Sequence, residues 1–501
     1  MSDLSVPTLI AFVSYIAIVM AIGFVAYLKT NNVSDYFLGG RRLTPVVSAI
    51  SASASDMSGW VLLGLPGYAY LVGLESVWIV IGLVLGVAAN WLLMARRLRV
   101  YSHQLDDALT IPSYLQRRFV ATNPWLRIIA SVCILFFFLF YVASGLIAGG
   151  KLFSQAFTVD YHWAVIISVI LIMVYTLFGG FLAVSWTDVF QALLMLLAIS
   201  AVPIVVLMQI EGDLIARVNL KNSQLLDMFS DIKGGDLGLV MIVSSMGWGL
   251  GYFGQPHVLA RFKALGNAAD SNVAAFIGIT WSLVCYCLAI LLGICGIAYL
   301  GNPLADPEKV FMVLVTVIFH PVIAGILLAA ILAAIMSTVD SQLLACSSTL
   351  AEDIFPMLNK KLLNKKLFKE KKPNANLRLK VGRCSVIFLS LIALLIALNP
   401  ESTVLGVVSY AWAGLGASLG PVMLTSLYWR SMTDTSALMG ILVGAGAVIL
   451  WSQIEGGIFD LYALVPAFVL SLMAIFLCSL VPKIKSKKTS VEQFEKMLEM
   501  L

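Results

Sequence analysis

Charged side chains are scarce in this chain. Lysine, arginine, aspartate and glutamate make up 12% of the 501 residues, whereas hydrophobic residues make up 60%. A soluble domain carries about 25% charged residues, so half that fraction excludes an ordinary soluble protein. The apolar stretches recur along the whole sequence and leave no polar block of domain size. We therefore expect a membrane protein without an appended kinase or nucleotide-binding domain.

Motifs for metal and cofactor chemistry are also missing. The chain has 4 histidines, and its 7 cysteines lie inside apolar stretches without the spacing of a metal site or a disulfide framework. No His-Glu-x-x-His zinc motif occurs. Glycines precede Lys151, but Leu152 stands where a phosphate loop has serine or threonine. We expect no enzyme, no catalytic residues and no bound cofactor.

Long apolar stretches are what the sequence has instead. A membrane-spanning helix needs about 20 mostly apolar residues, and thirteen such stretches occur, the first of them without the basic start of a cleaved signal peptide. They cover residues 6–28, 43–73, 76–94, 127–153, 163–182, 189–210, 237–260, 273–300, 321–354, 381–398, 404–429, 438–454 and 461–481. The sequence predicts an all-α polytopic membrane protein of 13 transmembrane helices. Its transmembrane domain would cover residues 1–482, and residues 483–501 would form a cytoplasmic C-terminal tail.

Basic residues predict the orientation. When the loops are assigned alternately to two sides, most lysines and arginines fall on one side, including the run at 360–372. The positive-inside rule then places the C-terminus in the cytoplasm and the N-terminus outside. We interpret the run at 360–372 as a loop facing anionic lipid rather than a nucleic-acid patch, because it lies between two spans.

Small polar residues interrupt the second predicted span. Residues 48–59 are Ser-Ala-Ile-Ser-Ala-Ser-Ala-Ser-Asp-Met-Ser-Gly. Hydroxyl side chains have weak helix propensity and compete for backbone hydrogen bonds, and an unpaired carboxylate at that depth costs about 2.5–3.5 kcal/mol. Local unwinding at Asp56 would free carbonyls and helix ends to bind a cation and an anionic group. The alternative is close helix packing, with Asp56 hydrogen-bonded as a structural group.

Glycine and proline interrupt the seventh predicted span. Four glycines occur within eight residues, and Pro256 follows them, so a regular helix cannot continue. Trp248 and Tyr252 are four residues apart and share a face on any helical portion. This pattern predicts a pocket for a small zwitterion with an apolar body. The alternative, an interfacial aromatic belt, is disfavoured by the mid-span position of Trp248. His257 is a structural histidine or a proton carrier.

Hydroxyls and an acid cluster in the ninth predicted span. Ser337, Thr338 and Ser341 lie within about one turn, and Asp340 is three residues after Ser337. Oxygen ligands of this kind suit a hard cation. The structural alternative is bonding of each hydroxyl to the preceding helical turn, but the added acid favours an ion path.

The two interrupted spans are five apart. Paired discontinuous helices in corresponding positions are typical of inverted repeats in transporters. We therefore predict a core of two five-helix repeats with inverted topology, spans 2–6 and 7–11, in which helices 2 and 7 are discontinuous.

The interrupted segments resemble the sodium/solute symporter family. The resemblance is carried by residues 53–60, 246–257 and 333–338, and by further segments at 179–188 and 409–414. It covers nearly the whole chain and implies sodium-coupled secondary active symport by alternating access, with L-proline as the imported solute. The same resemblance implies a multi-pass protein of the bacterial cytoplasmic (inner) membrane.

The resemblance also implies roles for individual residues. Sodium would bind between spans two and nine, to the carbonyls of Ala54, Met57 and Ala334 and the hydroxyls of Ser337 and Thr338. Sodium coupling or the ion path would involve Asp56, Arg41, Asp188 and Asp340. Asp340 departs from the family pattern, which has serine there, and leaves open a second cation or a proton role. The substrate would be bound by Ser58, Gly59, Tyr141, Trp248, Tyr252 and Pro256.

Other functions remain as alternatives. A symporter of the same family could carry another small solute, such as a different amino acid or pantothenate. A transporter-like membrane sensor is less favoured, because the sequence ends after a short tail. The expected partners are Na⁺, which is co-transported, proline or a similar small zwitterion, and the lipid bilayer, without nucleic acid. A monomer is expected to suffice for transport, and the Gly440–Gly444 spacing is compatible with either internal packing or a dimer face.

Overall fold

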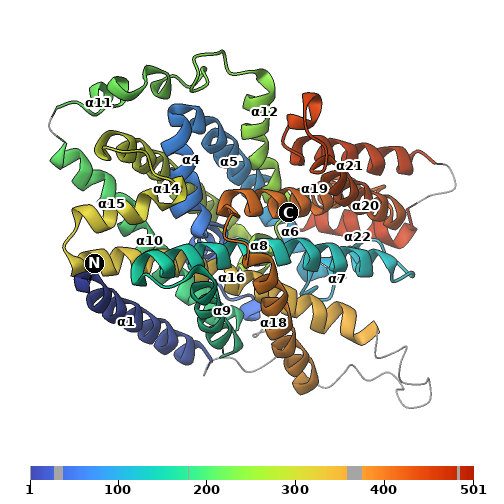
Figure 1. Cartoon of the computed structure of the whole chain (residues 1–501). Helices are drawn as coiled ribbons and strands as arrows, with labels where there is room; N and C mark the ends of the chain where they lie inside the picture. Colours follow the sequence, from blue (N-terminus) through green and yellow to red (C-terminus); the bar gives the residue numbers. More distant parts are fainter. Residues whose placement is uncertain (1, 28–37, 179, 211, 358–374, 482–485) are drawn as a thin grey trace.

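The computed structural model describes residues 2–27, 38–178, 180–210, 212–357, 375–481 and 486–501 (Figure 1). Within these ranges the chain is built from helices, and extended backbone pairs only at two isolated bridges. The basic run at 360–372 and the boundary predicted at residues 482 and 483 lie outside the described residues. The fold is therefore all-α over the part that is described, as predicted.

Helices occupy every range predicted to span the membrane. The longer uninterrupted ones are α1 (Ser2–Tyr27), α5 (Val77–Asn90), α8 (Trp125–Phe157), α9 (Tyr161–Phe178), α10 (Phe181–Gln209), α14 (Ser271–Tyr299), α16 (Pro321–Thr349), α18 (Ala375–Ala397), α19 (Val404–Tyr428), α20 (Asp434–Trp451) and α21 (Leu464–Ser479). Among the described residues, nine helical stretches are long and apolar enough to cross a membrane, and three shorter apolar helices join them. The protein is thus a multi-pass membrane protein, and the count of thirteen crossings stays a prediction.

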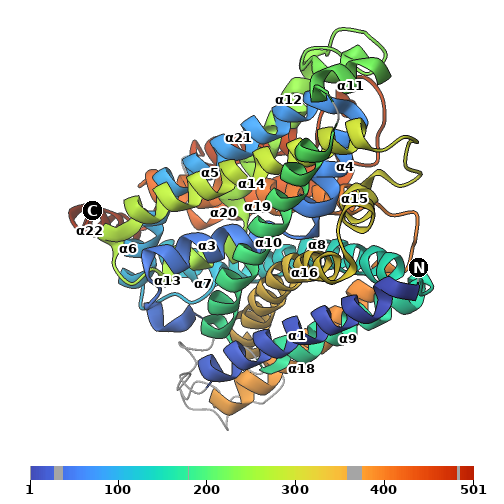
Figure 2. The ribbon, with the colours of Figure 1, turned by 90° about the vertical axis from the view of Figure 1, so that its left-hand side faces the viewer.

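Shorter helices connect these rods at their ends. They are α6 (Arg96–Gln104), α7 (Ile111–Arg118), α11 (Leu214–Lys221), η8 (Pro307–Lys309), α15 (Val310–Ile318), η10 (Gly457–Asp460) and α22 (Lys488–Glu499). Figure 2 shows α6, α7, α22 and α13 (Pro256–Ala264) at one end of the molecule, and α11 and α15 toward the other. The helix α22 docks at the first of these ends, where Phe494 and Met497 are buried and Arg118 donates to the hydroxyl of Ser490 at 2.7 Å.

The second predicted helix is broken, as expected. α3 covers Pro45–Asp56, and the chain leaves helical geometry at Met57, where φ is −78° and ψ is 71°. A π-helical turn η2 (Trp60–Gly64) then leads into α4 (Leu65–Val72). The hydroxyl of Ser55 donates to the carbonyl of Ala52, which is the local competition with helical bonding that the sequence predicted.

The seventh predicted helix is broken as well. It consists of α12 (Leu239–Gly247), a 3₁₀ segment η6 (Trp248–Gly254) and α13 (Pro256–Ala264). Close approach explains the glycines, because a Cβ on Gly249 would clash with the carbonyl oxygen of Gly82 in α5. The broken segment therefore lies directly against a neighbouring backbone, which only glycine allows.

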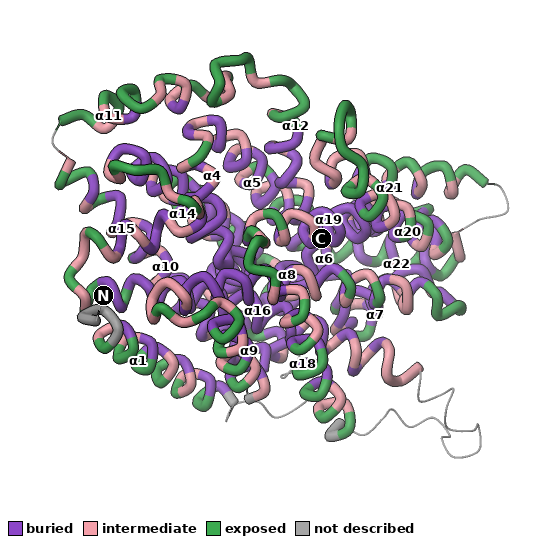
Figure 3. Tube along the Cα trace, viewed as in Figure 1, coloured by how far each residue is buried: buried purple, intermediate pink, exposed green. Residues whose placement is uncertain are grey.

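The two broken helices surround a deeply buried centre. α16 is the most buried of the candidate spans, and it contacts α3, α8 and α10. Figure 3 shows buried backbone along α16 and the interior of the bundle, whereas α1, α9 and α18 expose one face. Polar groups on α3 and α16 are thus brought together in the interior, away from lipid.

Candidate functional site

Asp56 lies where α3 ends, and tyrosines enclose its side chain. Asp56 is 1% exposed, and its Oδ2 accepts hydrogen bonds from the hydroxyls of Tyr252 at 2.6 Å and Tyr286 at 3.2 Å. Its Oδ1 accepts a longer bond of 3.5 Å from Tyr141. Because these tyrosines come from η6, α14 and α8, the carboxylate ties the break in α3 to three other elements. Two of them, Tyr141 and Tyr252, were predicted to bind substrate.

Aromatic rings line the same region. The rings of Trp60 and Trp248 lie 6.0 Å apart, and the indole of Trp412 donates to the carbonyl of Trp248 at 2.8 Å. Tyr252 meets Trp412 edge-on at 5.0 Å, and Tyr462 stacks on Trp248 at 5.2 Å. The cavity beside Asp56 measures about 10 Å³, which is room for one water. The site is therefore closed in this structure.

The predicted sodium ligands meet between α3 and α16. The carbonyl oxygen of Ala54 accepts from the hydroxyls of Ser337 at 3.0 Å and Thr338 at 3.3 Å, and Ser337 also donates to the carbonyl of Ala334 at 3.0 Å. Four of the five predicted ligands thus form one cluster of oxygens. Met57 is buried three residues after Ala54, and its N–H donates to Ser53 at 2.9 Å. Their role as ligands stays a prediction.

The two other predicted ion-path acids lie on α10 and α16. Asp188 of α10 accepts from Ser51 at 2.6 Å and pairs with Arg261 of α13 at 3.0 Å. Asp340 accepts a hydrogen bond from Thr176. One oxygen of each acid has no hydrogen-bond partner among the described residues. A buried carboxylate of this kind normally has partners, so both acids remain candidates for ion contact.

Three other predicted residues have contrasting positions. Arg41 lies apart from the oxygen cluster, where it pairs with Asp107 at 3.0 Å and donates to the carbonyl of Lys263 at 2.7 Å. Gly59 lies in the break, and a Cβ there would lie 2.6 Å from the Cβ of Ala148. Pro256 begins α13, so the orphan N–H groups of that helix start at the broken segment. Gly59 thus lies at the break after α3 and Pro256 at the break before α13, whereas Arg41 lies apart from both.

Ser58 is a buried member of the same break. Its hydroxyl accepts a long bond of 3.4 Å from the backbone N–H of Trp60, and its own N–H donates to the carbonyl of Asp56 at 2.9 Å. Ser58 thus shapes the turn that follows α3. Its predicted contact with substrate stays a prediction.

A larger cavity lies on the far side of the aromatic rings. It measures about 470 Å³ and is lined by residues of α4, α12, η8 and α19, with Trp248 and Tyr462 among them. We call it the outer vestibule, after the orientation proposed below. The Tyr462 hydroxyl donates to the carbonyl of Ser409 at 2.7 Å, which holds the ring over Trp248. These two stacked rings separate the outer vestibule from the closed site.

A buried charge cluster closes one edge of the outer vestibule. Lys151 of α8 pairs with Glu308 at 2.6 Å and with Asp306 at 2.9 Å. The carboxylate of Glu308 also accepts the backbone N–H groups of Val404 and Leu405, each at 2.9 Å. Glu308 therefore caps the positive N-terminal end of α19 while it binds α8.

Sequence reasoning missed several of these residues. Tyr286 and Trp412 lie in the regular apolar helices α14 and α19, where an aromatic residue is the ordinary sign of core packing. Tyr462 lies between η10 and α21, outside the predicted repeat core. Arg261 gave no clear signal either, because an arginine next to the end of a span normally reaches the membrane interface.

Interrupted helices that meet at buried oxygens and aromatic rings define a secondary transporter. The family model for the sodium:solute symporter family matches residues 36–444. The chain belongs to this family.

Relatives and solved structures agree with this assignment. The chain is 44% identical over 481 residues to the high-affinity proline transporter PutP of Bacillus subtilis, covering 95% of this chain and 98% of the relative. It is 44% identical over 492 residues to the sodium/proline symporter of Escherichia coli, covering 96% and 95%. The structure of a Na⁺-coupled sialic acid symporter aligns with a TM-score of 0.78 at 19% identity, covering 96% of this chain and 99% of that one. This last likeness concerns the fold alone.

Proposed function

We propose that the protein is a sodium-coupled symporter that imports L-proline by alternating access. The observation that carries the proposal is the break after α3, which adjoins the oxygen cluster at Ala54 and the aromatic enclosure at Asp56. Relatives that are 44% identical over nearly the full chain are named proline transporters. One break thus serves both the ion and the solute.

The oxygen cluster suits a sodium ion. Oxygens about 2.4 Å from one cation lie about 3.4 Å apart when their bonds make a right angle, and the hydroxyl-to-carbonyl separations here are 3.0–3.3 Å. Sodium would turn the hydroxyl protons of Ser337 and Thr338 away from Ala54. Sodium binding therefore excludes the hydrogen bonds that Ser337 and Thr338 now donate to Ala54. The oxygens are already close enough together that the ion needs little backbone movement to bind.

The aromatic enclosure suits the pyrrolidine ring of proline. Trp248 and Tyr252 offer apolar faces, and the start of α13 at Pro256 offers orphan N–H groups and a positive helix end to the substrate carboxylate. Asp56 would sense both ligands, because it lies between Ala54 and Tyr252. We assign Asp56 to coupling, together with Asp188 and Asp340 on the ion path.

Coupling follows from the shared break. Sodium that orders the end of α3 favours the state whose substrate pocket is complete, and each ligand must then raise the affinity of the other by the same factor. Each sodium ion moving inward gains about 2.3 kcal/mol per 100 mV of membrane potential. That energy drives accumulation of the solute.

We further propose thirteen spans, with a five-plus-five inverted-repeat core, the N-terminus outside and the C-terminus in the bacterial cytoplasm. The arginine-rich helices α6 and α7 lie together at one end, which supports an inner face there. The Lys151 cluster and α11 lie toward the other end. One chain holds every proposed ligand, which supports transport by a monomer.

Uptake into proteoliposomes tests the proposal. An inward sodium gradient should drive labelled proline uptake, and excess unlabelled proline should block it. Uptake that ignores sodium would contradict the coupling. A panel of amino acids and pantothenate, scored by sodium-dependent thermal stabilisation, separates proline from the alternative solutes. A transporter-like sensor would be stabilised by a ligand without accumulating it.

A further inference from the structure

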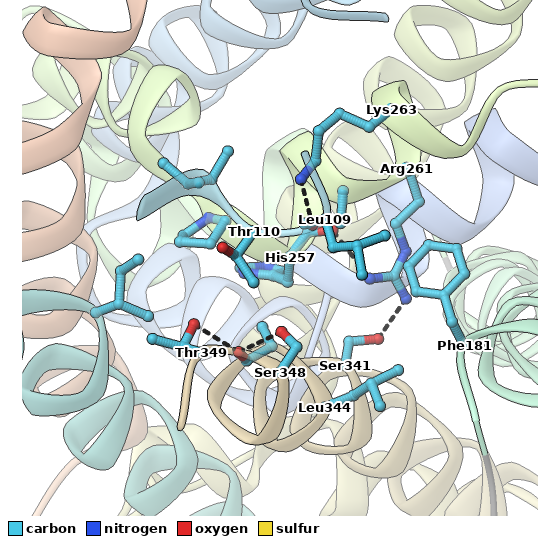
Figure 4. Close-up of a pocket in the computed structure, with 15 residues that line it drawn as sticks. Leu109, Thr110, Phe181, His257, Arg261, Lys263, Ser341, Leu344, Ser348 and Thr349 are labelled. Atoms are coloured by element: carbon cyan, nitrogen blue, oxygen red, sulfur yellow. Dashed lines mark hydrogen bonds between the residues drawn. The ribbon is translucent and has the colours of Figure 1, made fainter. Parts of the chain in front are cut away.

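A second small cavity borders the inner end of α13 (Figure 4). It measures about 30 Å³, which is room for about two waters. His257 and Lys263 of α13 face it from one side, and Ser341 and Thr349 of α16 face it from the other. We call it the inner cavity. Of the residues that line it, Pro256 alone belongs to the predicted sodium and substrate sites.

Lys263 is a buried cation without a counter-ion. It is 1% exposed, and its Nζ donates to the carbonyl of Leu109 at 2.6 Å. Within the described part of the chain it forms no salt bridge, and Asp353, whose charge reaches it, is already paired with Arg127 at 2.6 Å. Lys263 follows the predicted span 237–260 by three residues. Burial lowers its pKa to about 7, and the charge of Arg41 acts in the same direction.

His257 is a buried ring without hydrogen bonds. It is fully buried, and neither ring nitrogen has a partner among the residues described. Its ring packs 5.5 Å from Phe138 and 5.8 Å from Tyr141. A neutral imidazole still carries one N–H donor, and buried donors are normally satisfied. His257 therefore stands between Tyr141 of the closed site and the inner cavity with an unused donor.

Arg261 differs from its two neighbours on α13. It also lines the inner cavity, but its guanidinium pairs with Asp188 and donates to the hydroxyls of Ser51 and Ser341 and to the carbonyl of His257. Its charge is already neutralised. The positive charge that is left unbalanced in the cavity thus belongs to the protonated form of Lys263.

We propose that the inner cavity is a release site for the substrate carboxylate, which Lys263 and His257 bind after it leaves the start of α13 at Pro256. The inference rests on the proposed function. Pro256 lines the inner cavity too, and the seven residues from there to Lys263 correspond to about 10 Å along a helix. Because the present cavity has room for only about two waters, a carboxylate enters when the inner side opens.

Sided transport measurements test this site. The proline concentration that gives half-maximal transport is measured on each side of the membrane. Inside-out vesicles give the cytoplasmic value, and right-side-out vesicles give the outer value. Lys263→Gln should raise the cytoplasmic value about tenfold, the scale of one lost charged hydrogen bond, and leave the outer value unchanged. Lys263→Arg should stay close to the unsubstituted protein.

Arg99→Gln is the matched control. Arg99 also donates to backbone carbonyls at this end, those of Leu265 and Gly266, but it does not line the inner cavity. Arg99→Gln should leave the half-saturating proline concentration unchanged on both sides. If it raises the cytoplasmic value as much as Lys263→Gln does, the effect is a general one of charge and the proposal is overturned.

His257→Phe keeps the assay decisive if Lys263→Gln does not fold. It should raise the cytoplasmic value severalfold, and cyclopentanecarboxylate on the cytoplasmic side should inhibit it less than the unsubstituted protein. Unchanged values and unchanged inhibition would refute the release site. Absence of sodium-driven proline transport in the unsubstituted protein would instead refute the proposed function.

Discussion

Replacing Thr338 with valine removes one proposed sodium ligand and keeps the shape of the side chain. In the structure its hydroxyl donates to the carbonyl of Ala54 at 3.3 Å, which is long for a bond that is usually 2.7–2.8 Å. Losing it should destabilise the sodium-free protein by only about 0.5 kcal/mol. In the sodium-bound protein the substitution removes one ligand of the ion. The expected loss of binding free energy is about 1.5–3 kcal/mol, the value of a hydrogen bond to a charged group.

The difference corresponds to a rise of about tenfold in half-saturating sodium, since 1.4 kcal/mol is one factor of ten. The assay is proline uptake into proteoliposomes over a sodium titration, with Thr338→Ser as the control that keeps the hydroxyl. At saturating sodium the apparent affinity for proline should recover, because coupling is reciprocal. If Thr338→Val lowers thermal stability and leaves half-saturating sodium within about twofold, the hydroxyl only ties α16 to α3, and the ligand assignment is wrong.

Three further substitutions test other parts of the molecule. Glu308→Gln should lower the free energy of unfolding by about 3 kcal/mol, because the buried ammonium of Lys151 loses one of its two carboxylate partners. In chemical unfolding, the double variant with Lys151→Met should lose less free energy than the sum of the two single variants. Tyr462→Ala should speed the release of proline to the outer side about fivefold, the scale of one aromatic pair, when proline is washed out of sodium-loaded protein. Tyr462→Phe should not change the release rate. Equal rates for the two variants would argue against the Tyr462 ring covering the site. Gly249→Ala should destabilise the protein by about 1–3 kcal/mol or more by overpacking against α5, whereas Gly446→Ala has nothing within 4 Å and should unfold at the usual temperature.

The helix breaks were predictable because their causes are local. Serine-rich sequence before Asp56 and the glycines before Pro256 disrupt helical bonding within the segment itself, and the structure confirms both breaks. The partners of Asp56 were harder to predict. Tyr286 is an ordinary aromatic residue in a regular helix, and only the packing of α14 against α3 brings its hydroxyl to the carboxylate.

The tertiary contacts of charged residues at the inner end were also hard to predict from the sequence. The resemblance implied a role of Arg41 in sodium coupling; the structure shows Arg41 paired with Asp107, and the role stays a prediction. Lys263 gave no signal, because a lysine near the end of a span is normally a solvated residue. Its burial depends on α13, α16 and the segment at Leu109 coming together, and such tertiary burial is invisible in a local pattern.

Tyr462, the ring that covers Trp248, lies beyond residue 444, where the match to the family model ends. The proposed ion ligands and this ring are thus encoded in separate stretches of the gene. Under the proposed function, a change of solute can begin with substitutions near α21, while the codons for the proposed ion ligands stay unchanged. A chimaera that exchanges only the segment from Tyr462 to the end of α21 between two relatives would be a direct way to transfer substrate preference.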